Sequence, residues 1–190
     1  MIIEGKVSEL YNNYTIYLVP QPYSNSNKVD STKITNGKFN FKIPIDFAPI
    51  CEITISKKAN AHIQKLLVAV EPGILHAIID TTSSSYGTPL NDDLQHWKEL
   101  MALSGEEGMK LSKKIKENTD EQIIGKLEQD KEKIYQAFGD STFSFILRNQ
   151  NHVGGFIYMA TKNNFDSIQR KLLQESGIGE RVPIRKQSND

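Results

Sequence analysis

The pattern of apolar residues changes near residue 88, and this change constrains the fold more than any other feature of the sequence. Before it, short runs alternate apolar and polar residues, as at Phe39 and Phe41, a period typical of strands. After it, apolar residues recur at spacings of three and four, as at Leu94 and Trp97, which is typical of helices. Because no helical crossover separates the expected strands, the pattern predicts an α+β fold.

Residues 1–88 predict an antiparallel β-sandwich domain of about seven strands. Asn36-Gly37 is the strongest hairpin signal, because a type I′ turn needs two positive φ angles. Glu71-Pro-Gly73 predicts a second tight turn. The expected strands cover Ile2–Leu10, Thr15–Val19, Lys28–Thr35, Phe39–Ile43, Ile50–Ser56, Lys65–Val70 and Ile74–Ile79.

Residues 89–177 predict a helical region, and residues 178–190 a polar tail or linker. Thr88 is the expected N-cap of the first helix, because Pro89 suits the first helical position. Gly105 and Gly108 are expected to weaken this helix and to break it in two.

The following helices carry their own start and stop signals. Thr119 and Gln122 resemble a capping box, and Gly139 is the expected end of that helix. Two short helices are expected over residues 141–148 and 153–160. A last helix, over residues 165–175, is expected to stop at Gly177.

Composition excludes several classes of protein. The 190 residues carry 23 basic and 23 acidic side chains, and this balance argues against a nucleic-acid partner or an electrostatically held membrane protein. The longest apolar runs, 65–70 and 74–79, are too short for a transmembrane helix. The start lacks a basic and then apolar export signal, so either the protein is cytoplasmic or Met1 follows a removed signal.

No residue is predicted to be catalytic, cofactor-binding or metal-binding. Cys51 is the single cysteine, which excludes an intramolecular disulfide, and its place in an alternating strand predicts a buried, inert thiol. The histidines show no ligand spacing and are expected at the surface or at an interface: they are His62, His76, His96 and His152.

Other polar or aromatic groups favour structural roles. Asp92 and Asp93 follow a helix start, where carboxylates stabilise the positive end of the dipole. Gly154-Gly155 lacks the lysine of a phosphate loop and is expected to serve helix packing. The charge run Lys110–Lys133 predicts a solvated helix face. A tyrosine group predicts sheet packing, with a ligand-contacting patch as the alternative: Tyr11, Tyr14, Tyr17 and Tyr23.

Three ordered motifs, together with a fitting first strand, resemble a family. Residues 30–42 match a "DS…v..GkF.F" pattern, residues 70–80 match "iepG.i.v.id", and residues 86–94 match "v.GT.lN..l". Ile3-Glu-Gly-Lys-Val7 fits the usual first strand. Over about residues 1–97 the chain resembles a Bacteroidetes envelope family, domain of unknown function 4369.

The resemblance implies a periplasmic or outer-membrane-anchored protein with a lipoprotein signal upstream. Such domains often precede a helical connector and a thioredoxin-like domain. This sequence has no CxxC pair, so the redox activity of those larger proteins is not carried over. The tail 181–190 is too polar for a buried strand, which favours a stand-alone member over the front part of a longer protein.

The resulting expectation is a non-enzymatic binding, assembly or positioning module of the cell envelope, with no cofactor. The alternative is the accessory portion of a thiol-disulfide oxidoreductase whose redox domain lies elsewhere. A protein partner or self-association is expected, and the small-molecule ligand, if there is one, is unknown. Four apolar side chains are the expected interface: Trp97, Met101, Tyr158 and Met159.

Overall fold

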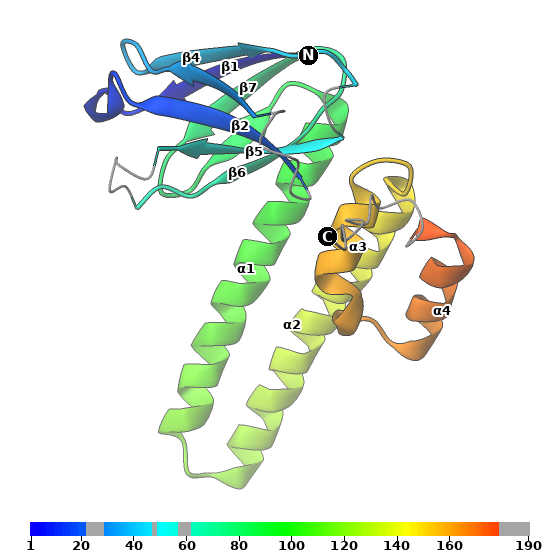
Figure 1. The fold of residues 1–190 in the computed structure, drawn as a ribbon. Coiled ribbons are helices and arrows are strands. Elements are labelled where there is room, and N and C mark those ends of the chain that lie inside the picture. The colour runs from blue at the N-terminus through cyan, green and yellow to red at the C-terminus, as the bar shows by residue number, and fades with distance from the viewer. Residues whose placement is uncertain (22–28, 47–48, 57–61, 179–190) are drawn as a thin grey trace, which may run out of the picture. The chain divides into compact units, whose positions relative to one another are not determined.

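The computed structural model describes residues 1–21, 29–46, 49–56 and 62–178, and these residues confirm the α+β class. The strands precede the helices along the chain (Figure 1). The strands are β1 (Ile2–Val7), β2 (Thr15–Gln21), β3 (Asp30–Lys33), β4 (Lys38–Lys42), β5 (Ile50–Ile55), β6 (Leu66–Ala69), β7 (Ile74–Ile79) and β8 (Ser84–Tyr86). The helices are α1 (Pro89–Glu117), α2 (Glu121–Arg148), α3 (Gly154–Thr161) and α4 (Ser167–Glu175), with 3-10 turns η1 (Glu9–Tyr11) and η4 (Lys162–Asn164).

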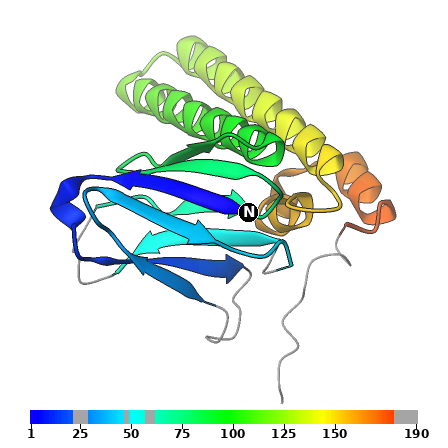
Figure 2. The same ribbon diagram turned by 90° about the horizontal axis from the view of Figure 1, so that it is seen from above.

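The strands form two sheets of four, in the orders β4-β1-β7-β8 and β3-β2-β5-β6. The sheets face each other as the layers of a sandwich (Figures 1 and 2). One pair departs from the expected antiparallel arrangement, because β1 and β7 run parallel, with Ile2 opposite Ile74. Alternation along a strand does not report the direction of its neighbour, so the sequence pattern could not distinguish the two cases.

The two predicted turns connect strands of different sheets. Asn36 and Gly37 have φ angles of 52° and 66°, as the predicted type I′ turn requires. This turn joins β3 and β4, which lie in different sheets. The turn at Glu71-Pro-Gly73 likewise joins β6 of one sheet to β7 of the other, so it does not close a hairpin. The additional strand β8 has three residues, too few to show a period.

The interior of the sandwich is apolar and continuous between the sheets. Its fully buried members include Ile3, Ile16 and Leu75. Gly5 on β1 lies beneath the ring of Phe39 on β4, and an added Cβ would overlap that ring. A glycine in a strand often marks such a close approach.

The first helix is unbroken, so the expected break at Gly105 and Gly108 is wrong. Gly105 has nothing within 4 Å of an added Cβ, and it costs the helix only its propensity. Gly108 is buried against Tyr135 of α2, whose hydroxyl lies within 2.5 Å of where a Cβ would stand. Figures 1 and 2 both show α1 and α2 side by side. Gly108 is therefore a packing residue, which its sequence context did not reveal.

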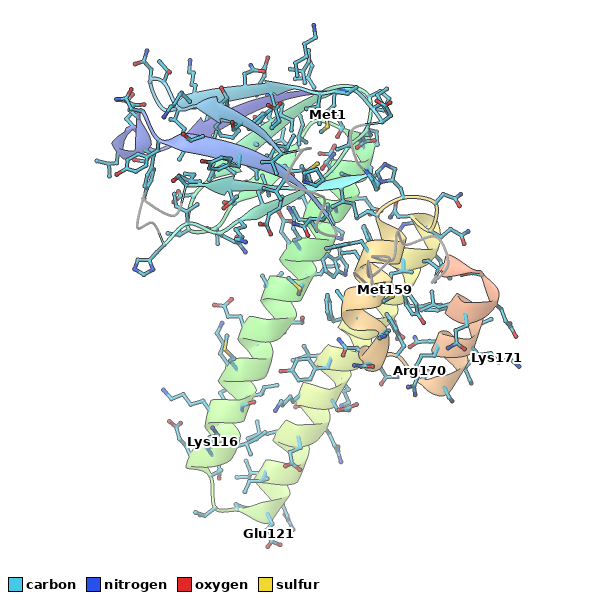
Figure 3. All side chains as sticks on the ribbon, viewed as in Figure 1. Met1, Lys116, Glu121, Met159, Arg170 and Lys171 are labelled. Carbon is cyan, nitrogen blue, oxygen red and sulfur yellow. The ribbon has the colours of Figure 1, made fainter. Side chains whose placement is uncertain are left out.

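The second helix is also longer than expected, because it continues through Gly139 to Arg148. Its N-cap is Asp120, whose carboxylate accepts hydrogen bonds from the N–H groups of Gln122 and Ile123, so the expected capping box from Thr119 is wrong. The predicted charge run is solvated: Glu106–Lys110 and Lys113–Glu117 pair at exposed positions. Lys116 and Glu121 lie near the turn that connects α1 to α2 (Figure 3).

The last two helices follow the expected pattern. Gly154 begins α3 with an added Cβ position 2.5 Å from the Ile146 carbonyl oxygen, which supports the packing role. Asp166 and Gln169 form a capping box at the start of α4. Gly177, with φ 69°, follows its end. The polar tail expected from residue 178 lies outside the described residues, except that Ile178 is fully buried.

The chain divides into two compact units within α1, between Gln95 and His96. The predicted domain boundary at residue 88 marks the end of the strands. The division lies further along because the first turns of α1 are bonded to the sandwich, through Asn91 among others.

Gly5 and Gly105 provide a paired test of glycine roles. We expect Gly5→Ala to lower the free energy of unfolding by about 1–3 kcal/mol, because a buried ring must move. Gly105→Ala should raise it by about 0.5–1 kcal/mol, because the position is open and helical. Urea unfolding followed by circular dichroism measures both changes. Equal effects of the two substitutions would contradict the assigned role of Gly5.

Candidate functional site

The densest group of buried polar side chains lies where β6 meets the first turn of α1. Asn91 is fully buried. Its amide oxygen accepts a hydrogen bond from the Ala69 N–H at 2.9 Å, and its amide nitrogen donates to the Ala69 carbonyl at 2.9 Å. The side chain therefore pairs with β6, the last strand of its sheet, as another strand's backbone would.

Glu71 caps the same helix from the turn that follows β6. Its Oε1 accepts hydrogen bonds from the N–H groups of Leu90 and Asn91 at 2.8 and 3.1 Å, and from the Asn91 amide nitrogen at 3.2 Å. The expected N-cap, Thr88, instead accepts a hydrogen bond from the Asn91 amide nitrogen through its hydroxyl, at 2.9 Å. A carboxylate from a distant turn thus performs the capping that sequence reasoning assigned to the adjacent threonine.

The same helix start also covers β8, the last strand of the other sheet. The Gly87 N–H donates to Asp92 Oδ1 at 2.8 Å, and the Ser85 N–H donates to Gln95 Oε1 at 3.2 Å. Asp92 lies in the first turn, as expected, and in addition it binds the incoming chain. Gly87 has φ 110° and would place a Cβ 2.9 Å from the Ile74 carbonyl, so this approach requires glycine.

These contacts give polar motif residues of two segments, 70–80 and 86–94, a structural role. Glu71, Thr88 and Asn91 bond to one another and to backbone groups. Polar side chains that bond to backbone groups in this way fix the geometry of the chain around them. This cluster is therefore a structural joint.

The histidines occupy separate places. His62 and His96 are exposed. His76 on β7 lies 3.5 Å from a Glu4 carboxylate oxygen, and its ring is tilted by 34° against that of Tyr86, with ring centroids 5.0 Å apart. Among the described residues, no three metal-binding side chains come together in a geometry that could hold an ion.

Cys51 is fully buried in β5 within the sandwich core, as predicted. Burial raises the pKa of its thiol to about 12. A thiol in such surroundings remains protonated and unreactive at neutral pH.

Lys98 is a titratable group that the sequence did not single out. It is half-buried on α1, and burial lowers its pKa to about 8, while the carboxylate of Glu99 opposes the shift. No residue type or spacing near Lys98 in the sequence predicts its partial burial, because that burial depends on tertiary packing.

The tyrosines of the first strands contact the core of the sandwich to different extents. Tyr11 and Tyr14 pack against the sandwich core and against each other, with ring centroids 6.2 Å apart. Tyr17 is half-buried, and Tyr23 lies outside the described residues.

The expected apolar interface does not form one patch. Trp97 is buried, donates from Nε1 to the Thr142 hydroxyl at 3.0 Å and stacks on Phe145 at 5.8 Å. Tyr158 is also buried. Met101 and Met159 remain 44% and 42% exposed, so half of the predicted set is core because aromatic rings here fill the helical interior.

The helical unit contains a cleft of about 630 Å³. One wall comes from α2 and the other from the segment of η4 and the start of α4. Its lining residues are Glu132, Tyr135, Gln136, Phe138, Gly139, Asp140, Thr142, Asn164, Phe165, Asp166 and Gln169. Gly139, one of these residues, was predicted to be a helix end and not part of a cleft.

No helix among the described residues has the length and apolar character needed to cross a membrane. This is consistent with the short apolar runs of the sequence.

Asn91 supports a direct test of the structural joint. Asn91→Ala should lower the free energy of unfolding by about 2–4 kcal/mol, because two buried backbone groups of Ala69 lose their partners. The exposed Asn163 is the matched control, and Asn163→Ala should change stability by less than about 0.5 kcal/mol. Equal stability of the two variants in urea would contradict the edge-pairing role.

Cys51 should react slowly with a thiol reagent in the native state. Because the thiol is fully buried and burial raises its pKa to about 12, alkylation at pH 8 should be at least about a hundredfold slower than in denaturant. Mass spectrometry of timed aliquots measures both rates. Insulin reduction by the chain should not exceed the buffer control, and rapid native labelling with insulin reduction would contradict both expectations.

Lys98 should make stability depend on pH in the alkaline range. Between about pH 8 and pH 10.4 the unfolded lysine holds a proton that the folded one has lost, so the contribution of Lys98 to the free energy of unfolding rises with pH. The raised pKa of Cys51 makes a contribution of the opposite sign in the same range. Lys98→Met should remove the contribution of Lys98 relative to the wild type. The exposed Lys110→Met should retain it, and ionisation of Cys51 on unfolding acts on all three proteins alike. Urea midpoints at intervals from pH 7 to 10 provide the comparison, and parallel profiles for wild type and Lys98→Met would refute it.

Comparison with known proteins places the first unit in a family. A search of curated proteins and a search of solved structures gave no match to this chain. Residues 1–94 match the family model described as "Domain of unknown function (DUF4369)". The match ends inside the first turns of α1, after Asn91 and the buried Leu94. Residues 1–94 of this chain therefore belong to the family of domain of unknown function 4369.

Proposed function

We propose that this chain is a non-enzymatic binding, assembly or positioning module of the bacterial cell envelope. The observation that carries the proposal is the structural use of Glu71, Thr88 and Asn91. The polar groups of these motifs hold the first turns of α1 on the edge of the sandwich and do not gather around an open site. A domain organised in this way serves to hold a helix.

The envelope location rests on the resemblance of the motifs to an envelope family. The binding role is supported by the second unit, where a cleft lies between α2 and the start of α4. Exposed apolar side chains on this unit, among them Met109 and Ile168, offer further contact area.

A paired experiment tests location and assembly. Cells that carry the native gene are fractionated, and an antibody follows the protein through cytoplasmic, periplasmic and membrane fractions. Multi-angle light scattering of the purified chain across a wide concentration range measures self-association. We expect the protein in an envelope fraction, together with a concentration-dependent mass or a stable complex with one partner.

Two outcomes would count against the proposal. A protein confined to the cytoplasm would remove the envelope role. A strict monomer, with no partner recovered by cross-linking in cells, would remove the assembly role. Recovery of a partner that carries a CxxC pair would instead favour the accessory role in thiol-disulfide exchange.

A further inference from the structure

The cleft of the helical unit combines negative charge with aromatic rings. Three carboxylates line it, from Glu132, Asp140 and Asp166, and no lysine, arginine or histidine is among its lining residues. Two cations lie beside the lining residues. The Lys131 Nζ is 5.9 Å from the centroid of the Tyr135 ring, and the Nε of Arg170, a residue labelled in Figure 3, donates to the Asp166 backbone carbonyl at 3.3 Å. Among the described residues, neither cation forms an ion pair with a carboxylate of the cleft.

Two of the carboxylates retain capacity to accept hydrogen bonds. Asp140 accepts one hydrogen bond, from Gln169 Nε2 to Oδ1 at 2.9 Å. Within the part of the chain that the structure describes, Glu132 makes no ion pair. Asp166 differs, because its Oδ1 is engaged by the Gln169 N–H as the cap of α4. Glu132 and Asp140 are therefore the groups available to a ligand.

The aromatic side chains of the cleft pack against other residues of the helical unit. Phe138 lies 6.2 Å from the ring of Trp97, and Phe165 lies 6.3 Å from the ring of Phe143. Tyr135 packs against Gly108 through its hydroxyl. Aromatic rings beside carboxylates suit a flat cation, which stacks on the rings while it bonds to the acids.

The openness of the cleft indicates how such a cation is presented. Glu132, Gln136, Asp140 and Asn164 are exposed, although Phe165 beneath them is buried. Sites for free small molecules enclose most of the ligand, whereas this cleft would leave one side in water. A side chain carried on a protein segment fits that geometry, because its backbone remains outside.

We propose that this cleft receives an arginine side chain of a partner protein. The proposal rests on the binding role proposed above and names the chemistry of the partner. The guanidinium enters the cleft where the carboxylates of Glu132 and Asp140 supply negative charge and the partly exposed ring of Phe138 supplies an apolar wall. Arginine fits better than lysine, because its planar fork can engage a carboxylate bidentately and stack at the same time.

The test is a titration of the full chain with the peptide Ac-Ser-Gly-Arg-Gly-Ser-NH2, followed by nuclear magnetic resonance. The same peptide with citrulline in place of arginine is the neutral control, and agmatine is the free-cation control. We expect saturable shifts in the amides of residues 132–142 and 164–169, with Kd at or below about 1 mM. The citrulline peptide should bind at least about tenfold more weakly.

Variants separate the cleft from general negative charge. Glu132→Gln with Asp140→Asn keeps the side-chain shapes and the acceptor for Gln169, and should weaken peptide binding at least about tenfold. Glu107→Gln with Glu128→Gln removes the same charge at exposed positions outside the cleft, and should change Kd less than about twofold.

Filling the cleft is a third test. Gly139 lines it, and an added Cβ would lie 3.9 Å from the Asn164 carbonyl oxygen, an ordinary contact. Gly139→Leu should abolish binding without loss of helix content, because leucine favours helices more than glycine does.

Several results would overturn the proposal. These are absence of shifts up to about 10 mM peptide, equal binding of the citrulline peptide, and equal weakening by the two double variants. Binding of agmatine as tightly as the peptide would also overturn it, in favour of a free organic cation. If the chain assembles in the envelope while the peptide does not bind, the proposed function stands and this site assignment fails.

Discussion

The paired hydrogen bonds between the Asn91 amide and the Ala69 backbone are the contact on which the organisation of the first unit depends. An open sheet edge exposes unpaired backbone groups, and every sandwich must protect its edges. Here a helix start provides the protection, because Asn91 pairs with β6 while Asp92 and Gln95 bind N–H groups at β8. The helix thereby closes one edge of each sheet, and Glu71 caps it in return.

This arrangement explains how much of the fold the sequence could predict. Strands with one buried face show alternating apolar and polar residues, and Asn36-Gly37 predicts its turn, because these signals are local in the sequence. The parallel pairing of β1 with β7 and the three-residue strand β8 depend on contacts between distant segments. The glycines show the same limit. Taken alone, Gly108 predicts a weakened helix, whereas its structural role comes from packing against Tyr135 of α2.

The candidate functional residues show the same limit, because local patterns predict some of them and contacts between distant segments determine the others. The buried Cys51 was predictable, because one residue in an alternating strand has one expected environment. The cleft was not, since its walls come from α2 and from the start of α4, which the sequence separates by α3. Asp140 and Gln169 meet at 2.9 Å although their positions are 29 residues apart in the sequence. The capping role of Glu71 was missed for the same reason, because its partners are at positions 90 and 91.

The two units therefore use polar side chains in opposite ways. In the first, Asn91 and Glu71 are committed to backbone groups, so a substitution there would loosen the joint between strand and helix. In the second, Glu132 and Asp140 are exposed on α2, and Asp140 accepts one hydrogen bond, from Gln169. The family match covers residues 1–94 and ends before this cleft begins. The family match therefore includes the joint that holds α1, whereas the cleft lies in the residues that follow the match.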